Sequence, residues 1–221
     1  MYDAKFSLVI TNYNRAEFLA RSIRSCLLQL ILHQKIQVLI VDDGSTDGSK
    51  EVLNEFTDEV DIIALKTNRG VAAASNVGLK HAKGKYWMRV DADDYLSMHA
   101  CAFMGAVLDN NDDVGFVFGD HIRLDSEGTS KLRVSLADED ALFEHGAGVL
   151  FRTEILREIG GYDESLLNCE DRDLLYRMKR AGVCGYHIPV PLYRYYIHGK
   201  NISQNVDRAY YKEIVESKNE V

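Results

Sequence analysis

The chain of 221 residues is long enough for one large domain or two small ones, and 46% of its residues are hydrophobic, which suffices for a buried core. This share excludes disorder for most of the chain. Lys and Arg number 26 against 34 Asp and Glu, so the formal charge is −8 and a nucleic acid is not expected as a partner.

The cysteine pattern and the apolar runs bear on location. Four cysteines are far apart and form no C-x-x-C pair: Cys26, Cys101, Cys169 and Cys184. This spacing favours neither a zinc site nor a disulfide framework and fits a reducing compartment. The first residues lack a signal-peptide pattern, and the longest apolar run is too short to form a transmembrane segment. We therefore expect a soluble, cytoplasmic protein.

Short apolar runs alternate with helix-period segments in the first half, which is typical of β-α units on a largely parallel sheet. Asn14 is predicted to be the N-cap of a first helix, because Glu17 follows three residues later and apolar residues then recur at helical spacing as far as Leu30. A second helix is predicted around residues 52–56 and a third at residues 70–82. Strands are predicted at residues 6–11, 36–41, 61–65 and 86–90.

The second half of the chain does not continue the regular alternation of strands and helices. Residues 120–136 are charged and rich in turn formers, which predicts an antiparallel excursion rather than another β-α unit. Helices are expected at residues 98–108 and 170–181 and in the tail after Asn205. Strands are expected at residues 114–119 and 146–151, with one or two more at residues 184–195.

Polar clusters follow the four strands of the first half, at residues 11–15, 42–45, 68–70 and 91–94. Ligands bind at the carboxyl ends of the strands in an open α/β sheet. Turn chemistry explains any one cluster equally well, because Asn, Asp, Gly and Ser dominate loops. The coincidence of all four predicts one binding site.

Asp91 and Asp93 are the sharpest feature of the sequence, because they directly follow an apolar strand and no group that compensates their charge is apparent. Mg²⁺ or Mn²⁺ prefers carboxylate oxygens and keeps positions open for substrate phosphates. The alternative is a solvated loop that caps the next helix. The sequence contains no G-x-x-x-x-G-K-[ST] motif and no G-x-G-x-x-G after the first strand, so we expect a metal to neutralise any diphosphate.

Several motifs, in this order and spacing, resemble the family 2 glycosyltransferases of GT-A fold. They are SLVITNYNR at residues 7–15, VDDGSTD at 41–47, N-x-G at 68–70 with Asn76, VDADD at 90–94, GGYD at 160–163, ED at 170–171 and YRYYIH at 193–198. The resemblance extends over nearly the whole chain. It implies an α/β fold with a Rossmann-like, mostly parallel sheet flanked by helices and a smaller antiparallel portion on the acceptor side.

The resemblance also implies one domain over residues 1–221. Residues 1–95 would bind the nucleotide, residues 96–205 would hold the acceptor and the catalytic groups, and residues 206–221 would form a tail. The implied activity is an inverting transfer of a sugar from a nucleotide-diphosphate donor to a hydroxyl acceptor, with Mn²⁺ or Mg²⁺ as cofactor.

Matching positions assign the donor site. The residues assigned to it are Thr11, Asn14, Arg15, Asp42, Asp43, Asn68, Asn76 and Asp91. Asp43, with Asp42 beside it, would accept a hydrogen bond from the base. An acidic side chain there suits the imide hydrogen of uracil or thymine, which predicts a UDP- or dTDP-linked donor. Asp93 would be the chief metal ligand, helped by Asp91, with His198 as a third ligand or else only a capping residue.

Asp171 is the expected catalytic base, because an inverting transfer needs a carboxylate to take the proton of the acceptor hydroxyl. Glu170 would orient Asp171 or touch the acceptor. The alternative is that both acids only favour a helix N-terminus electrostatically. Ser75 departs from the family, which often has Arg there, so Arg69 or Lys80 would contact the phosphates or that contact would be absent.

The expected role is bacterial polysaccharide or glycoconjugate synthesis, with a carbohydrate or glycolipid acceptor. The sequence does not decide whether the protein makes a peripheral contact with a membrane. It also leaves open the oligomeric state, a dimer included. One alternative is a non-catalytic nucleotide-sugar-binding module, which the departure at Ser75 would suit. A haloacid-dehalogenase-like phosphatase is less favoured, because its nucleophilic Asp normally follows the first strand.

Overall fold

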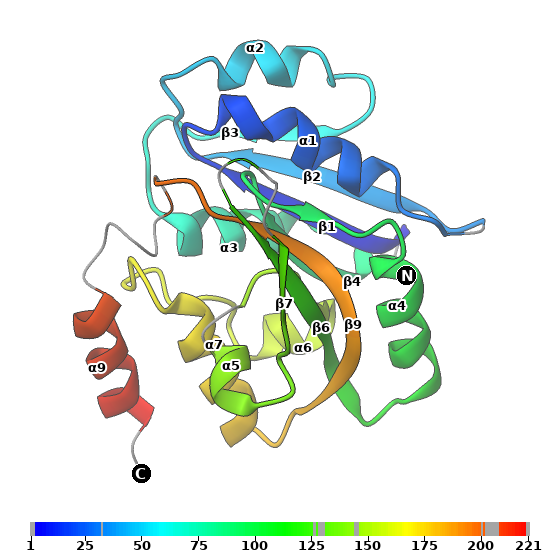
Figure 1. The fold of residues 1–221 in the computed structure, drawn as a ribbon, viewed down its shortest axis with the longest axis vertical. Coiled ribbons are helices and arrows are strands. Elements are labelled where there is room, and N and C mark those ends of the chain that lie inside the picture. Colours follow the sequence, from blue (N-terminus) through cyan, green and yellow to red (C-terminus); the bar gives the residue numbers. More distant parts are fainter. Residues whose placement is uncertain are drawn as a thin grey trace.

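The structure is a computed structural model that describes residues 3–31, 33–125, 127, 131–143, 146–199, 201 and 208–219. Over these ranges nine strands form one sheet in the order β3-β2-β1-β4-β8-β6-β9-β5, with β7 paired to β6. Helices flank the sheet (Figure 1). No helix in the described part of the chain is both long enough and apolar enough to cross a bilayer.

The first half consists of β-α units, as the sequence predicted. Its parallel strands are β1 (Ala4–Asn12), β2 (Ile36–Asp42), β3 (Asp61–Ala64) and β4 (Gly84–Asp91). Its helices are α1 (Ala16–Leu27), α2 (Ser49–Asn54) and α3 (Val71–His81). Thr11 is in register with both Val41 and Asp91, so the carboxyl ends of β1, β2 and β4 meet at one edge.

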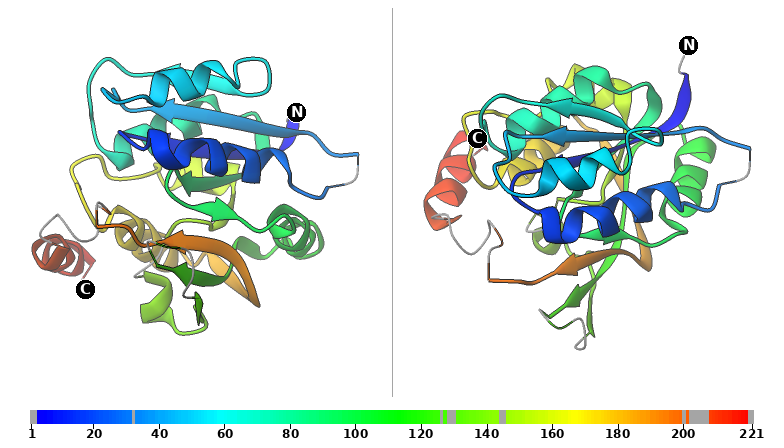
Figure 2. Two further views of the ribbon diagram at one scale, coloured as in Figure 1. Left: turned by 45° about the horizontal axis from the view of Figure 1, so that its top comes forward. Right: turned by 90° about the horizontal axis from the view of Figure 1, so that it is seen from above.

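Alternate residues of these strands bury against opposite helices, because successive side chains of a strand point to opposite faces. Leu8 and Ile10 pack with α1 and α2, whereas Val9 packs with α3. The two helix layers lie on the two sides of β1 and β2 (Figure 1; Figure 2). A Cβ at Gly78 would lie 2.3 Å from Cγ1 of Val9, so this glycine permits the close approach of α3 that the small residues predicted.

In the second half of the chain the sheet curls, and its strands pair in both parallel and antiparallel directions. Its strands are β5 (Tyr95–Leu96), β6 (Val114–Leu124), β7 (Lys131–Val134), β8 (Leu150–Arg152) and β9 (Cys184–Tyr196). Its helices are α4 (Ala100–Asn110), α5 (Glu139–Phe143), α6 (Thr153–Glu158), α7 (Glu170–Arg180) and α9 (Arg208–Asn219). The predicted excursion is confirmed, because β7 pairs antiparallel with β6, but β9 runs parallel to β6.

Helix α9 lies at the edge of the molecule beside α7 (Figure 1). Its buried residue Val215 packs with Leu166 and Cys169, just before α7, and Glu216 accepts a hydrogen bond from Arg172 at 2.8 Å. The helical tail is therefore confirmed over Arg208–Asn219, whereas residues 205–207 lie outside the described residues.

The predicted start of the first helix was wrong. Arg15 occupies the N-cap position, and Asn14 has a left-handed backbone with φ 54°. The amide of Ala16 is capped instead by Asp47 Oδ2 at 3.0 Å, from the loop after β2. The helix ends at Leu27, three residues before the end of the apolar pattern. A tertiary contact between two loops thus took the place of the local cap.

Candidate functional site

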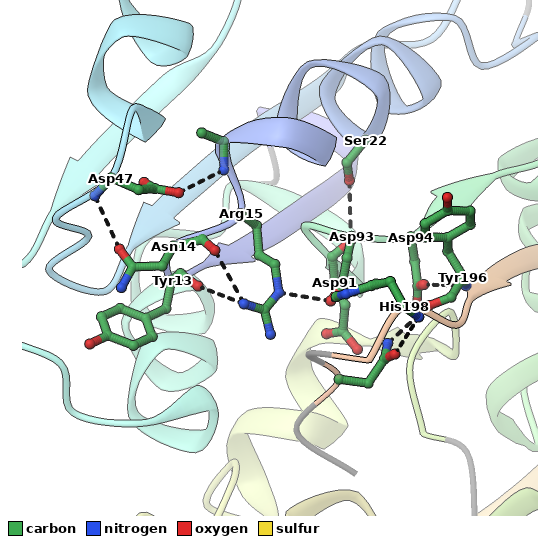
Figure 3. Close-up of polar contacts among 12 residues, drawn as sticks. Tyr13, Asn14, Arg15, Ser22, Asp47, Asp91, Asp93, Asp94, Tyr196 and His198 are labelled. Carbon is green, nitrogen blue, oxygen red and sulfur yellow. Dashed lines mark hydrogen bonds and ion pairs between the residues drawn. The ribbon is translucent and has the colours of Figure 1, made fainter. Parts of the chain in front are cut away.

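The loops after β1 and β2 are tied together by their own polar side chains. Asn12 Nδ2 donates to Asp42 Oδ1 at 2.6 Å, and the Ser45 hydroxyl accepts from the Asn14 amide at 2.9 Å. Asn14 Oδ1 accepts the backbone amide of Thr46 at 2.7 Å and that of Asp47 at 3.3 Å, the second of which is drawn in Figure 3. The structure therefore brings Thr11, Asn14, Arg15, Asp42 and Asp43 to one edge of the sheet.

Asp43 holds the loop before α3. Its carboxylate accepts the amide of Arg69 at 2.9 Å and the amide of Gly70 at 2.8 Å, while Asn68 Oδ1 also accepts the Gly70 amide at 3.0 Å. Burial raises the pKa of Asp43, although these backbone bonds oppose the shift. Each carboxylate oxygen has a second lone-pair site, so Asp43 retains capacity for another donor.

Asn76 joins α3 to the loop after α6. Its Nδ2 donates to the carbonyl of Tyr162 at 2.9 Å, and its Oδ1 accepts the amide of the same residue at 2.9 Å. The structure thus gives Asn76 a role in holding the two halves of the chain together. Ser75, at the position where the family often has Arg, donates to the carbonyl of Val71, and Arg69 pairs with Glu164 at 2.9 Å.

The charges of Asp91 and Asp93 are compensated, contrary to the expectation from the sequence. Arg15 Nε lies 2.9 Å from Asp93 Oδ2 (Figure 3). Arg89 Nε lies 3.1 Å from Asp91 Oδ1, an ion pair without hydrogen-bond geometry. These arginines precede their partners by 78 residues and by two residues. Their roles were missed, although a lone Arg in the apolar strand 86–90 was a visible signal.

His198, which the resemblance offers as a third metal ligand or else as a surface or capping residue, lies against Asp93. Its Nε2 is 2.9 Å from Asp93 Oδ2, and its backbone amide donates to Asn201 Oδ1 at 2.8 Å (Figure 3). The imidazole is 4.5 Å from the Phe18 ring, centroid to centroid, and stacks with Tyr196. His198 is therefore a buried residue of this site rather than a surface residue.

The donor set of Asp93 and His198 fits a divalent cation that is completed by phosphate oxygens. In the described part of the chain no three His, Cys, Asp or Glu side chains are arranged to hold a metal by themselves, and Asp91 is paired with Arg89. Mg²⁺ is usually bound through one or two carboxylates plus substrate phosphates. Among the residues that the structure describes, His198 Nδ1 has no hydrogen-bond partner, and the ring is held through Nε2 and by stacking.

Two carboxyls of the VDADD motif, Asp93 and Asp94, have pKa values shifted in opposite directions. Burial would raise the pKa of Asp93, but hydrogen bonds from His198 and Arg15 lower it below its usual value. Burial raises the pKa of Asp94 well above its usual value, with repulsion from Asp93 and Asp91 adding to the shift. Asp94 Oδ1 accepts the amide of Tyr196 at 2.8 Å. The ionised form is therefore favoured at Asp93 and disfavoured at Asp94.

Glu170 and Asp171 begin α7 and meet the same arginine as Asp91. Arg89 Nη1 donates to Glu170 Oε1 at 2.9 Å, and Arg89 Nη2 donates to Asp171 Oδ2 at 2.7 Å. Cys169, just before the pair, has a left-handed backbone with φ 61°. One buried guanidinium thus connects the two acids at the start of α7 with the end of β4.

Asp171 has an environment that suits a proton acceptor. Burial raises its pKa to about 8; Glu170 and Asp91 push in the same direction, and Arg89 opposes them. A general base works best when its pKa lies near the operating pH. The site therefore pairs an ionised Asp93 with a carboxyl that exchanges a proton near neutral pH.

Comparison with known proteins decides the family. Residues 7–160 match the family described as glycosyl transferase family 2. The chain belongs to this family. A glycosyltransferase of Nostoc sp., described as uncharacterized, is 30% identical over 172 residues, which cover 70% of this chain and 53% of the relative. The putative glycosyltransferase EpsE of Bacillus subtilis is 29% identical over 203 residues, covering 86% and 72%.

Solved structures show that this family 2 glycosyltransferase has the GT-A fold predicted from its motifs. TarS of S. aureus in complex with UDP-GlcNAc has a TM-score of 0.80 at 18% identity, covering 97% of this chain and 66% of TarS. The mannosyltransferase PcManGT of Pyrobaculum calidifontis, in complex with GDP-Man and Mn²⁺, has a TM-score of 0.77 at 19% identity, covering 99% and 64%. The family does not favour the phosphatase alternative. The chain spans 53%, 37% and 32% of three of its curated relatives.

Proposed function

We propose that this chain transfers a sugar from a UDP- or dTDP-linked donor to a hydroxyl acceptor, with inversion at the anomeric carbon. One observation carries the proposal: Asp171, a carboxyl suited to accept a proton, shares the Arg89 guanidinium with Asp91 at the edge where the loops after β1 and β2 also meet. The TarS complex with UDP-GlcNAc and the PcManGT complex with GDP-Man support a nucleotide-sugar donor on this fold.

The nucleoside end of the donor is assigned to the loops after β1 and β2. The carboxylate of Asp43 accepts the imide N–H of uracil or thymine through a lone pair that the loop amides leave open, with Asp42 beside it. Thr11, Asn14 and Arg15 are assigned to the same end of the donor, and Asn68 holds the neighbouring loop through the Gly70 amide. Asn76 is assigned an indirect role at the nucleoside end: it holds the loop that contains Tyr162.

The diphosphate end is assigned to Asp93 and His198, which would hold Mn²⁺ or Mg²⁺, and to Asp91. Such a cation, when bound, stabilises the charge of the leaving nucleoside diphosphate. The chain's own groups prepare this end: Arg15 and His198 keep Asp93 ionised, and Phe18 and Tyr196 hold the imidazole in place.

Asp171 takes the proton from the acceptor hydroxyl as its oxygen attacks the anomeric carbon. Its Oδ2 accepts from Arg89, which leaves Oδ1 for the acceptor hydroxyl, and Glu170 accepts from the other arm of the same guanidinium. The acceptor is a carbohydrate or glycolipid, and the reaction belongs to cytoplasmic steps of bacterial polysaccharide or glycoconjugate synthesis. One domain over residues 1–221 carries both donor and acceptor sites.

A thermal-shift panel tests the donor assignment, because a ligand that binds only the folded state raises the melting temperature by mass action. UDP-, dTDP-, GDP- and CMP-linked sugars are added with Mn²⁺, Mg²⁺ or a chelator to the wild type and to Asp93→Ala. Asp113→Ala, which removes an exposed carboxylate in the loop after α4, is the matched control. We expect a metal-dependent shift with uracil or thymine nucleotides in the wild type and the control, and its loss in Asp93→Ala.

The same samples separate an enzyme from a binding module. Release of free nucleoside diphosphate in the presence of Mn²⁺ and an acceptor array marks transfer, whereas a thermal shift without release marks binding alone. A preference for a guanine or cytosine nucleotide would overturn the assignment of Asp43. Full turnover of Asp93→Ala in chelator would overturn the metal assignment.

A further inference from the structure

We infer that Arg89 is a positioning residue for catalysis: its guanidinium, together with the bare backbone of Gly146, holds Asp171 so that one carboxylate oxygen stays free for the acceptor proton. This inference rests on the proposed function, because it assigns Arg89 to the catalytic base rather than to the donor. Arg89 lies in β4 and its side chain is 4% exposed.

The guanidinium of Arg89 is divided among three carboxylates on two elements. Its Nη1 and Nη2 donate to Glu170 and Asp171, and its Nε faces Asp91 at 3.1 Å. The ring of Tyr162 lies 5.6 Å from the guanidinium carbon and covers it. The planar fork of Arg can serve acids on different sides in one fixed orientation, which the single ammonium of Lys cannot do.

Glu170 and Asp171 need such a partner because they are adjacent acids: the Glu170 side chain is buried, at 8% exposed, and the Asp171 side chain is partly buried, at 16% exposed. Removing the cation from a buried ion pair leaves uncompensated charge, which is strongly unfavourable away from water. Without Arg89, Asp171 would lose the ion pair that holds its carboxylate in its present orientation. The guanidinium therefore fixes where the base points.

Gly146 closes the other side of the Asp171 side chain. A Cβ at this position would lie 2.1 Å from Cβ and 2.2 Å from Cγ of Asp171, closer than real side chains approach. Asp171 is thus confined between Gly146 and Arg89. Oδ2 accepts from Arg89, while Oδ1 accepts no hydrogen bond from the part of the protein that the structure describes. That oxygen is the one left for the acceptor.

A double-mutant cycle tests whether Arg89 acts through Asp171. Arg89→Lys is made in the wild type and in Asp171→Asn, and turnover is followed with radiolabelled nucleotide sugar so that residual rates are measurable. We expect Arg89→Lys to lower kcat by at least about tenfold in the wild type and by less than about threefold in Asp171→Asn, since coupled neighbours are non-additive. Arg152→Lys is the control, because Arg152 in β8 donates to the backbone carbonyls of Leu108, Asn111 and Val114 and lies over the Tyr86 ring, and in the described part of the chain no carboxylate pairs with it.

Gly146→Ala tests the same inference without changing any charge. We expect its kcat to fall by at least about tenfold, its donor KM to change by less than about twofold, and the loss to disappear in Asp171→Asn, because both substitutions act on the same carboxylate. If Arg89→Lys does not fold, the comparison of Gly146→Ala in the wild type and in Asp171→Asn tests the inference by itself.

Three results separate the outcomes. Equal fold losses in both backgrounds would mean that Arg89 acts through Asp91 or through folding alone and would overturn the inference. Wild-type kcat in Arg89→Lys, or in Gly146→Ala where Arg89→Lys does not fold, would overturn it too. Absence of nucleoside diphosphate release by the wild type with every nucleotide sugar would instead contradict the proposed function.

Discussion

The donor edge of this site, where we propose that the nucleotide sugar binds, and the base edge, where we propose that Asp171 acts, are built in different ways. On the donor edge, Asp43 and Asn14 hold loops that follow neighbouring parallel strands, and their partners are backbone amides of those loops. On the base edge, Asp171 begins a helix 80 residues beyond Asp91, and its direction depends on a guanidinium from β4. The first edge follows from turn chemistry at strand ends, whereas the second exists only once the two halves of the chain have packed.

Asp93 and Asp171 have pKa values that shift in opposite directions. Hydrogen bonds from His198 and Arg15 lower the pKa of Asp93, whereas burial raises that of Asp171 to about 8. Carboxyls whose environments separate their pKa values carry different roles in a site. Asp93 is suited to hold a cation at any physiological pH, and Asp171 is suited to exchange a proton.

The largest effect is expected from Asp171→Asn, which keeps the size of the base and removes its charge. Positioned general bases contribute roughly a hundredfold to ten-thousandfold in rate, so kcat should fall by at least about two orders of magnitude. Donor affinity, measured by calorimetry with a non-transferable analogue, should stay near the wild-type value. Glu170→Gln should lose less; if the two variants exchange these phenotypes, their roles are reversed.

The pH profile of kcat tests whether Asp171, whose pKa is raised, is the group that accepts the proton. Asp171 must be deprotonated to act, so below its pKa of about 8 the rate should fall by about tenfold per pH unit and level off above that value. Initial rates from about pH 6 to about pH 9 with saturating donor measure this. A flat profile through this range would place the proton acceptor elsewhere, with Asp163 and Asp173 next to be tested.

Asp43→Ala addresses the donor edge. Loss of a hydrogen bond to a charged group should weaken nucleotide binding by about 1–3 kcal/mol, and kcat at saturating donor should change little. Calorimetric titration with UDP measures the affinity. Asp58→Ala, which removes an exposed carboxylate after α2, is the control. An unchanged UDP affinity in Asp43→Ala would restrict Asp43 to holding the loop before α3.

The smallest effect is expected from Asn76→Ala, which cuts a link between the two edges. The variant leaves the amide and carbonyl of Tyr162 without their partner, so the free energy of unfolding should fall by about 1–2 kcal/mol. Urea unfolding measures this loss, and UDP affinity should stay close to that of the wild type. Weaker UDP binding at unchanged stability would instead return Asn76 to the donor site.

Much of the fold was predictable because its signals are local. Alternation of strand and helix periods gave the order of elements from β1 to β4, and the small residues around Gly78 indicated a helix packed close to a strand. Helices α5 and α6 were not predicted, because five and six residues are too few for a periodic pattern to emerge. The cap of α1 was misassigned because Asp47, 31 residues beyond Ala16, provides it.

The sequence by itself determined which residues reach the carboxyl edge of the sheet, because strand ends and turn formers are encoded within short stretches of chain. It also determined that Glu170 and Asp171 begin a helix. Only the tertiary structure decided that Arg89 faces both acids and Asp91, and that Arg15 and His198 share Asp93. Ion-pair partners separated by about 80 to 105 residues depend on how whole elements pack, and no local pattern specifies that packing.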